Sequence, residues 1–404
     1  MSLPTGQNQA RDAVPRVLRA PCVALIAACF AVAAVFAAQG TTATATAQET
    51  TAPQADPTPS EELTVTSWGG AYLQSQKKAY GAPWEKKSGN RINWGTYVGD
   101  LAEIRRQVRE KKIRWDVVDV LPDAARIGCD EGLFEKLPSG TLAPGAGGES
   151  IDDDLLVKRP NDCVAPLVFW SYVTFFDPAT FKDKEAPKTI ADFFDVEKYP
   201  GKRGIHTWPN ALVEMALVAD GVPVRDVYKV MATDEGIDRA FAKLDTIRDH
   251  VVFWSSGARP LDLVRKKEVV MSVAYNGHVG AAVLSEGAPF ETIWDGQVLE
   301  EEWLVVVKGT PRKAAALDFV SFATAPERQA DQARHINYGP MRKSAFQLIA
   351  RGEPWFHNGK NIMPHMPNRN DVIDRSVFAD PVWWQRNGDK MRARFKAWRD
   401  RSAR

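Results

Sequence analysis

Apolar and polar positions along the chain recur with periods that predict an α/β protein. Leu63 to Thr66 is a short β-branched run that predicts a strand, and Tyr72 to Trp84 places large side chains at helical intervals. Ile92 to Tyr97 predicts a second strand. Trp115 to Leu121 is nearly continuously apolar, as expected of a buried parallel strand. Strands and helices in this succession are typical of a doubly wound sheet.

A second series of strands and helices begins after Cys163. Its strands are expected at Leu167 to Phe176, Val251 to Trp254, Val269 to Tyr275 and Trp303 to Val307. A chain of 404 residues is too long for one compact core. We therefore predict two α/β lobes, each an open sheet flanked by helices.

The N-terminal segment has the pattern of a secretory signal peptide covering residues 1–47. Arginines precede an apolar run from Val23 to Ala38, and an A-x-A site follows at Ala45–Ala47. A retained membrane anchor is the alternative, but about 16 apolar residues fall short of the roughly 20 that a span needs. A lipobox-like sequence ends at Cys29, and the apolar residues after it argue against lipidation. Residues 48–60, rich in Thr, Pro and Ala, predict a flexible tether.

These features predict a periplasmic protein with one internal disulfide. Cys129 and Cys163 remain after signal removal, an even pair in an oxidising compartment, with free buried thiols as the alternative. Neither cysteine has the spacing of a metal site, and we expect no metal or cofactor. The net charge of +1 argues against a nucleic-acid partner.

Aromatic and acidic residues gather where predicted strands end. Trp68 precedes Gly69 and Gly70, which let the backbone approach a ligand closely at the start of a helix. Such junctions lie at the ligand-binding edge of open α/β sheets. The other residues at this kind of junction are Asp119, Asp123, Trp254, Tyr275, Asn276, Asn337 and Tyr338. Ring faces and carboxylates together suit an organic cation, although each aromatic taken alone is more often part of the core than a ligand contact.

Motifs of catalysis are missing from the sequence. There is no G-x-S-x-G, H-E-x-x-H or phosphate-binding loop, and we expect no catalytic residues. A secreted enzyme on the same scaffold is the alternative from another class, with His206 and His278 as its nearest histidines. The acidic run Glu300–Glu302 immediately precedes a predicted strand, so Glu302 could face the binding edge.

The chain resembles the extracellular solute-binding proteins of the spermidine/putrescine ABC-transporter type from Glu61 to Arg404. The resemblance rests on S-W-G-G-A-Y, W-D-V-V-D-V, G-C-D-E-G-L-F-E-K-L, D-F-F-D-V-E-K-Y-P-G-K-R, A-L-V-A-D-G-V, S-V-A-Y-N-G and I-N-Y-G-P-M. It implies the two-lobed periplasmic-binding-protein fold of type II and, in part of the family, a cysteine pair. It also implies a monomeric receptor that hands a small amine to a membrane permease and its ATPase.

The resemblance transfers binding roles to particular positions. Trp68, Asp119 to Asp123, Tyr275 and Tyr338 match the family's ligand contacts. Where polyamine binders carry a close acidic pair, this chain has Thr207-Trp208-Pro209-Asn210, and the nearest acid is Glu214. We expect Asn210 and Glu214 at the site, with Glu302 as the late carboxylate.

A ligand that is anionic or zwitterionic is the alternative to a polyamine. Gly69-Gly70 and Ser255-Ser256-Gly257 lie at predicted helix N-termini, where anions bind, and Arg259 is close by. We predict a first lobe of residues 61–165 and 296–335, and a second lobe of residues 166–295 and 336–404.

Overall fold

A mixed sheet forms the centre of the computed structural model, which describes residues 61–402. The predicted signal peptide, Cys29 and the tether lie outside the described residues. The path of hydrogen-bonded strands is β2-β1-β3-β8-β4-β7-β5-β6, with β9 paired to β4 and β10 paired to β8. The strands are β1 (Glu62–Ser67), β2 (Arg91–Thr96), β3 (Val117–Val120), β4 (Val164–Phe176), β5 (Arg203–His206), β6 (Val251–Trp254), β7 (Met271–Tyr275), β8 (Glu291–Val306), β9 (Gly339–Pro340) and β10 (Val377–Phe378).

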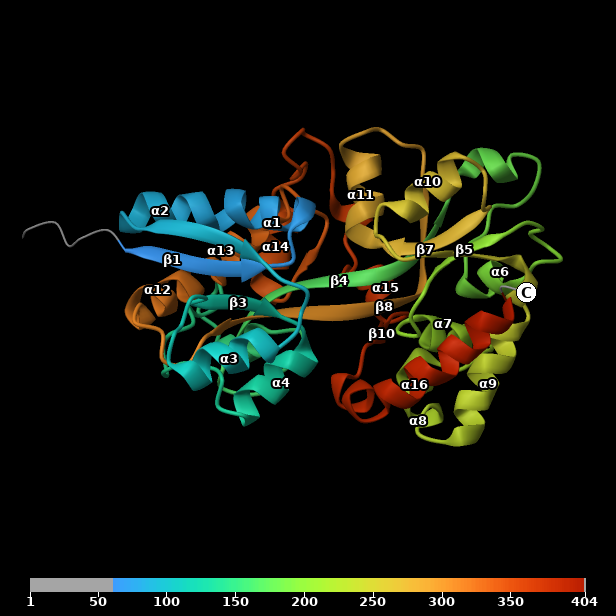
Figure 1. Ribbon diagram of the computed structural model, residues 1–404. Coiled ribbons are helices and arrows are strands. Elements are labelled where there is room, and N and C mark those ends of the chain that lie inside the picture. The colour runs from blue at the N-terminus through green and yellow to red at the C-terminus, as the bar shows by residue number, and fades with distance from the viewer. Residues whose placement is uncertain (1–60, 403–404) are drawn as a thin grey trace, which may run out of the picture. The chain divides into compact units, whose positions relative to one another are not determined.

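Two long antiparallel strands, β4 and β8, join the two ends of this sheet (Figure 1). The parallel strands β1, β2 and β3 lie at one end, which we call the first lobe, and the parallel strands β5, β6 and β7 lie at the other, the second lobe. The register between β4 and β8 shifts between Pro166 and Val168, and again between Tyr172 and Thr174. Such irregularities bend a strand and increase its local twist.

Helices connect the strands. They are α1 (Gly70–Gln76), α2 (Ala82–Ser88), α3 (Ala102–Glu110), α4 (Pro122–Asp130), α5 (Ile151–Asp154), α6 (Ile190–Phe194), α7 (Leu212–Ala219), α8 (Val227–Val230), α9 (Asp234–Asp245), α10 (Arg259–Arg265), α11 (Asn276–Leu284), α12 (Lys313–Ala323), α13 (Pro326–Gln332), α14 (Lys343–Arg351), α15 (Asn370–Ile373) and α16 (Pro381–Ser402). One π-helical turn, Lys77–Gly81, joins α1 to α2, so the helix predicted from Tyr72 to Trp84 is longer than expected at both ends.

Each end of the sheet has its own apolar core. In the first lobe, Phe319 of α12 packs edge-on against Trp84, with the ring centroids 5.4 Å apart. In the second lobe, Trp384 and Phe395 of α16 join the core made by α7 and α9. Figure 1 shows α16 lying along these two helices. Separate cores on a shared sheet are consistent with two lobes connected through β4 and β8.

The predicted disulfide is present and joins Cys129 of α4 to Cys163, directly before β4. The alternative of two free thiols is thereby set aside. No helix within residues 61–402 has both the length and the apolarity that a membrane span requires.

One strand prediction was wrong at its start. The acidic run Glu300–Glu302 lies inside β8, which begins at Glu291, instead of preceding a strand that begins at Trp303. A strand tolerates these carboxylates because successive side chains point to opposite faces. The register pairs Trp170 with Glu300 and Val168 with Glu302, so Glu300 and Glu302 share a face of the sheet with Trp170.

Candidate ligand-binding site

The Glu302 carboxylate is held between two indole rings from different parts of the sheet. Trp68, directly after β1, donates its Nε1–H to Oε2 at 3.0 Å, and Trp170 of β4 donates to Oε1 at 2.9 Å. Both indoles are half-buried, while Glu302 is buried. Because each carboxylate oxygen already accepts a hydrogen bond, Glu302 orients two aromatic walls that a ligand can contact.

Asp119 lies beside Glu302 and forms an acidic pair with it. It is fully buried on β3 and accepts hydrogen bonds from Ser67 Oγ at 3.0 Å and Gln76 Nε2 at 2.7 Å. Burial raises the pKa of Asp119 above its usual range. Burial and the neighbouring Asp119 carboxyl raise the pKa of Glu302 well above that of an ordinary glutamate. Two like charges this close do not readily ionise together.

Glu300 differs from these acids because nothing donates to its carboxylate. No side chain or backbone N–H within the described part of the chain forms a hydrogen bond or ion pair with it, and the residue is partly exposed. Burial raises the pKa of Glu300 well above the usual range, and the carboxylates of Glu214, Glu301 and Asp123 raise it further. A carboxylate surrounded by other carboxylates and by no cation is a strong acceptor for an ammonium group.

Aromatic rings form the wall beside Glu300. The Trp170 ring centroid lies 5.1 Å from that of Tyr172 and 5.4 Å from that of Tyr275, and the two tyrosine rings are 5.2 Å apart. The Tyr275 ring in turn packs against Trp254 at 5.9 Å. Ring faces attract cations, so this wall complements the acid next to it.

The Trp208 indole stacks on the imidazole of His206 with 4.4 Å between centroids and donates to the Tyr172 hydroxyl at 3.1 Å. The His206 ring is buried, and its Nδ1 lies 2.7 Å from the carbonyl oxygen of Trp208. Since a carbonyl only accepts, Nδ1 carries the proton of the neutral ring. Burial lowers the pKa of His206 to about 3, so the ring is uncharged at neutral pH.

Several predicted residues lie in or beside this cluster. Trp68 and Asp119 flank Glu302, Trp254 and Tyr275 belong to the ring wall, and Tyr338 packs on Tyr72 with centroids 5.3 Å apart. Gly69 and Gly70 have φ values of 88° and 59°, a conformation that glycine adopts without strain. They turn the chain from β1 into α1 directly after Trp68.

Other predicted residues have different surroundings from those expected. Asn276 is buried, and its amide accepts from the Ser171 N–H and donates to the Asn337 carbonyl, so it supports Tyr275 structurally. Glu214 accepts hydrogen bonds from Tyr228 Oη and Trp384 Nε1, both at 2.8 Å, and anchors α16. Asn210 is half-buried before α7.

Two predicted acids, one from each lobe, raise the pKa of Glu300 through their negative charges. Asp123 is exposed on α4 of the first lobe, and Glu214 is buried on α7 of the second. Both raise the pKa of Glu300, although neither donates a hydrogen bond to it. They therefore add negative potential around a carboxylate that the sequence analysis did not single out.

Five residues of the candidate site were not predicted as ligand-binding from the sequence: Trp170, Tyr172, His206, Trp208 and Glu300. Trp170 and Tyr172 lie within a strongly apolar run, which predicts burial and hides a ligand-facing side. The signal for Glu300 was present: acids two apart in a strand share one face, so Glu300 accompanies Glu302.

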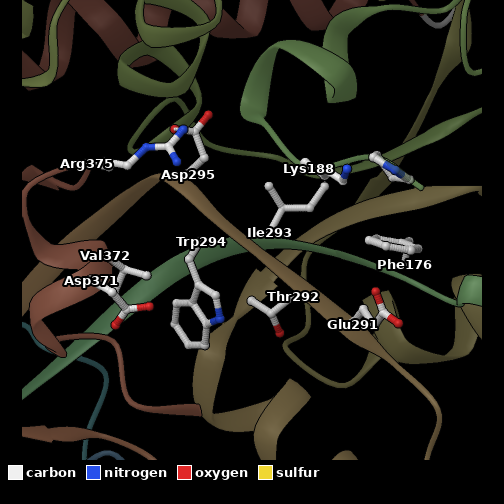
Figure 2. A pocket seen from close by; sticks show the side chains of 11 residues that line it. Phe176, Lys188, Glu291, Thr292, Ile293, Trp294, Asp295, Asp371, Val372 and Arg375 are labelled. Atoms are coloured by element: carbon white, nitrogen blue, oxygen red, sulfur yellow. Dashed lines mark hydrogen bonds and ion pairs between the residues drawn. The ribbon is translucent and has the colours of Figure 1, made fainter. Parts of the chain in front are cut away.

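A surface hollow of about 270 Å³ lies elsewhere on the molecule (Figure 2). It is formed by the first residues of β8 together with α15, and Figure 2 shows the Arg375 guanidinium beside Asp295. None of the predicted ligand-binding residues lines it. Arg375 and Asp295 in its lining are already paired with each other, so the candidate site remains the cluster around Glu300.

Two lobes on a shared sheet, with rings and carboxylates gathered along the connecting strands β4 and β8 and at the ends of neighbouring strands, are typical of a protein that binds small molecules. The profile of the bacterial extracellular solute-binding proteins matches residues 79–364, and the chain belongs to this family. The predicted two-lobed α/β fold is confirmed by related solved structures of periplasmic binding proteins.

Relatives with named ligands cover most of the chain. A gamma-aminobutyric acid (GABA)-binding protein of Pseudomonas aeruginosa is 36% identical over 339 residues, which are 84% of this chain and 91% of that protein. The solved structure of a GABA receptor has a TM-score of 0.70 at 29% identity and covers 84% of this chain and 97% of its own. The glucopine-bound MotA of A. tumefaciens B6 has a TM-score of 0.70 at 27% identity, with 84% and 99% covered.

The polyamine part of the expected resemblance is not confirmed by these comparisons. The spermidine/putrescine-binding protein PotD of Streptococcus pneumoniae has a TM-score of 0.62 but only 14% identity, which shows a shared fold. The family assignment is therefore broader than the spermidine/putrescine type that the motifs indicated.

Proposed function

We propose that this protein is the substrate-binding component of an ABC importer and that its ligand is a small zwitterion with an ammonium and a carboxylate group, such as GABA. It captures the ligand in the periplasm and delivers it to a membrane permease that works with an ATPase. Membership of the solute-binding family and the ligands named for its relatives support this proposal.

The single observation that carries the proposal is the Glu300 carboxylate without a donor. An ammonium group beside Trp170 and Tyr275 would donate to this carboxylate and lie against aromatic faces. It would also offset the repulsion from Glu214 and Asp123. Glu214 and Asp123, which were predicted as contacts of a cationic ligand, thus favour binding of the ammonium group of the proposed zwitterion.

The start of α11 offers a place for the carboxylate end. This helix of nine residues begins at Asn276, directly after Tyr275, and no side chain caps its first N–H groups. Free N–H groups and the helix dipole favour an anion at this end. The expected anion donor Arg259 is less suited, because it forms an ion pair with Glu268 at 3.0 Å.

A second ammonium group has less support at the other end of the site. The stretch from Thr207 to Asn210 carries no acid, its Trp208 indole is half-buried, and the adjacent ring of His206 is buried and neutral. Both carboxylate oxygens of Glu302 already accept hydrogen bonds from indole N–H groups, so Glu302 is less suited to bind a second ammonium group. These features favour a zwitterion over putrescine or spermidine.

The enzyme alternative gains no support from the histidines. Within residues 61–402, neither His206 nor His278 forms a hydrogen bond with a hydroxyl, and His206 donates to a backbone carbonyl. General-base catalysis needs a base within reach of the proton that it removes. A receptor role therefore remains the better-supported function.

Isothermal titration calorimetry of the mature protein tests the proposal with four probes: GABA, 5-aminopentanoate, putrescine and butanoate. We expect saturable binding of at least one of the two zwitterions and weaker or no binding of putrescine and butanoate. Preference for putrescine would favour the polyamine function instead, and heat with butanoate alone would contradict the role of Glu300.

A further inference from the structure

Two ring nitrogens at the ends of β5 and β6 in the second lobe are buried without a hydrogen-bond partner. They are Nε2 of His206 and Nε1 of Trp254, in side chains that are 0% and 2% exposed. Buried polar atoms of folded proteins are nearly always paired, and an unpaired one is destabilising. The two atoms therefore call for a common explanation.

The chemistry of each ring decides whether its nitrogen donates or accepts a hydrogen bond. Because His206 Nδ1 carries the proton that is donated to the Trp208 carbonyl, Nε2 presents a lone pair and needs a donor. The indole nitrogen of Trp254 carries a hydrogen and needs an acceptor. The pair thus presents one acceptor and one donor.

The fold places the two rings side by side at the binding edge. His206 ends β5 and Trp254 ends β6, and these residues are partners in the parallel register. Their ring centroids are 5.3 Å apart, and the planes are nearly perpendicular at 81°. Ligands of open α/β sheets bind outside the carboxyl ends of the strands, which is where both residues lie.

The surrounding rings connect this pair to the candidate site. His206 packs on Tyr172 at 5.1 Å, and Trp254 packs on Tyr275 at 5.9 Å. These two tyrosines also border Trp170, the sheet partner of Glu300. A ligand held at Glu300 can therefore extend toward the pair along a continuous aromatic wall.

We propose that His206 and Trp254 form a specificity subsite for a neutral ligand group that both donates and accepts a hydrogen bond, namely a hydroxyl or a carboxamide. The inference rests on the proposed function and adds a third recognised group to the ammonium and the carboxylate. A hydroxyl donates to His206 Nε2 and accepts from Trp254 Nε1–H, and a carboxamide does the same with its NH₂ and its carbonyl.

Charged groups fit the pair less well. A carboxylate accepts from Trp254 but faces the lone pair of His206, and an ammonium donates to His206 but leaves the Trp254 N–H without an acceptor. A site built to bond both sides of a polar group discriminates strongly against analogues that lack it.

Two matched probe pairs test the subsite by calorimetry. 4-Amino-3-hydroxybutanoate differs from GABA by a hydroxyl, and glutamine differs from norvaline by a carboxamide in place of a methyl group. We expect one polar probe to bind at least threefold more tightly than its partner. The Trp254→Phe variant, which keeps a ring but loses the N–H, should abolish that difference.

A control variant and an NMR measurement provide further tests of the His206–Trp254 subsite. Trp294→Phe, outside the ring wall, should preserve the difference. In the wild-type protein, acetamide should shift the ¹⁵N resonance of His206 Nε2, assigned with a His206→Gln variant, whereas acetate should not. Lack of a shift with acetamide overturns the subsite, as does a ligand preference that persists in Trp254→Phe.

The outcomes separate this inference from the proposed function. Equal binding of both members of each probe pair overturns the subsite and leaves the zwitterion receptor intact. Absence of binding by all four amino acids contradicts the proposed function, and the acetamide measurement then decides the subsite by itself.

Discussion

Trp170 and Glu300 face each other across the register of β4 and β8, on the two strands that both lobes share. The indole of Trp170 is fixed by its hydrogen bond to Glu302, whereas the carboxylate of Glu300 receives no donor from the described residues. An oriented ring and an unpaired acid thus lie side by side. This pair gives the binding site its main chemical character.

Replacing Glu300 with glutamine should weaken the binding of GABA or a related zwitterion roughly 10- to 100-fold, since a hydrogen bond to a charged group is lost. The unliganded protein should not lose stability, because the ionised carboxylate is unfavourable where it lies. Calorimetry and thermal melting measure the two effects. Glu291→Gln, an exposed position at the start of the same strand, should change neither. Unchanged affinity in Glu300→Gln would contradict the ammonium site.

Binding of the ligand should release protons wherever part of the unliganded protein carries a proton on Glu300. Burial and the neighbouring carboxylates raise the pKa of Glu300, and an ammonium group favours its ionised form. Affinity should therefore increase with pH until Glu300 is fully ionised. Calorimetry in buffers with different ionisation enthalpies measures the proton release, which should be absent in Glu300→Gln. A buffer-independent binding enthalpy in the wild type would argue against this linkage.

The stability of the unliganded protein should respond to pH through Glu214. Burial raises the pKa of Glu214 to about 6, compared with 4.5 for an ordinary glutamate. The folded state therefore binds more protons between these values, and stability falls as pH rises through them. Above pH 7 the cost is about 2 kcal/mol. Urea unfolding should show Glu214→Gln stabilised at pH 8 by up to that amount and nearly unchanged at pH 4.5.

Glutamine is a suitable replacement at this position because its carbonyl oxygen can still accept from Tyr228 and Trp384. Asp389→Asn, whose side chain is fully exposed on α16, serves as the matched control and should have little effect at either pH. A Glu214→Gln variant that is equally destabilised at both pH values would show that the carboxylate holds α16 in a way that the amide does not.

The hydrogen bond from Trp170 Nε1–H to the Glu302 carboxylate should contribute to the free energy of unfolding. Trp170→Phe keeps an aromatic ring but removes a donor from a buried carboxylate, so we expect a loss of about 1–2 kcal/mol in the free energy of unfolding. Trp294→Phe should cost less, because its ring stacks under Arg369 and phenylalanine preserves that contact. Chemical denaturation of the two variants tests this order, and equal losses would mean that the N–H to Glu302 contributes little.

Removing the disulfide should also lower stability. Cys129 and Cys163 are 34 residues apart, and closing a loop of this size contributes about 4 kcal/mol in the chain-entropy model. The Cys129→Ser/Cys163→Ser double variant should therefore melt at a lower temperature. Adding a reductant should lower the melting temperature of the wild type toward that of the variant, and leave the variant itself unchanged.

The positions at strand ends could be predicted because apolar runs define where buried strands stop. Trp68, Trp254 and Tyr275 follow directly from such runs, and the strands lie close to their predicted bounds. Glu300 was not found in this way, because the acidic run was predicted to precede a strand that begins at Trp303, whereas it lies inside β8. Only the pairing with β4 shows that this run lies within a strand.

Tertiary partners account for the remaining differences. Asn276 follows Tyr275 in the chain, yet its amide is engaged by Ser171 and Asn337, which lie far away in the sequence. Glu214 is the nearest acid to the position where the resemblance implies an acidic pair, but its donors come from Tyr228 and from α16. The choice between ligand contact and structural support is therefore decided by residues that a local pattern does not contain.

The two register shifts of β4 lie on either side of Trp170, one before Val168 and one after Tyr172. If the lobes rotate, we expect the backbone to flex at these two irregular places, which flank the segment that carries the indole. A ligand bound against Trp170 would then contact the segment about which the lobes turn. Ligand recognition and the conformational change that a transporter detects would involve the same residues. The fluorescence of Trp170 would therefore change with both ligand binding and lobe rotation.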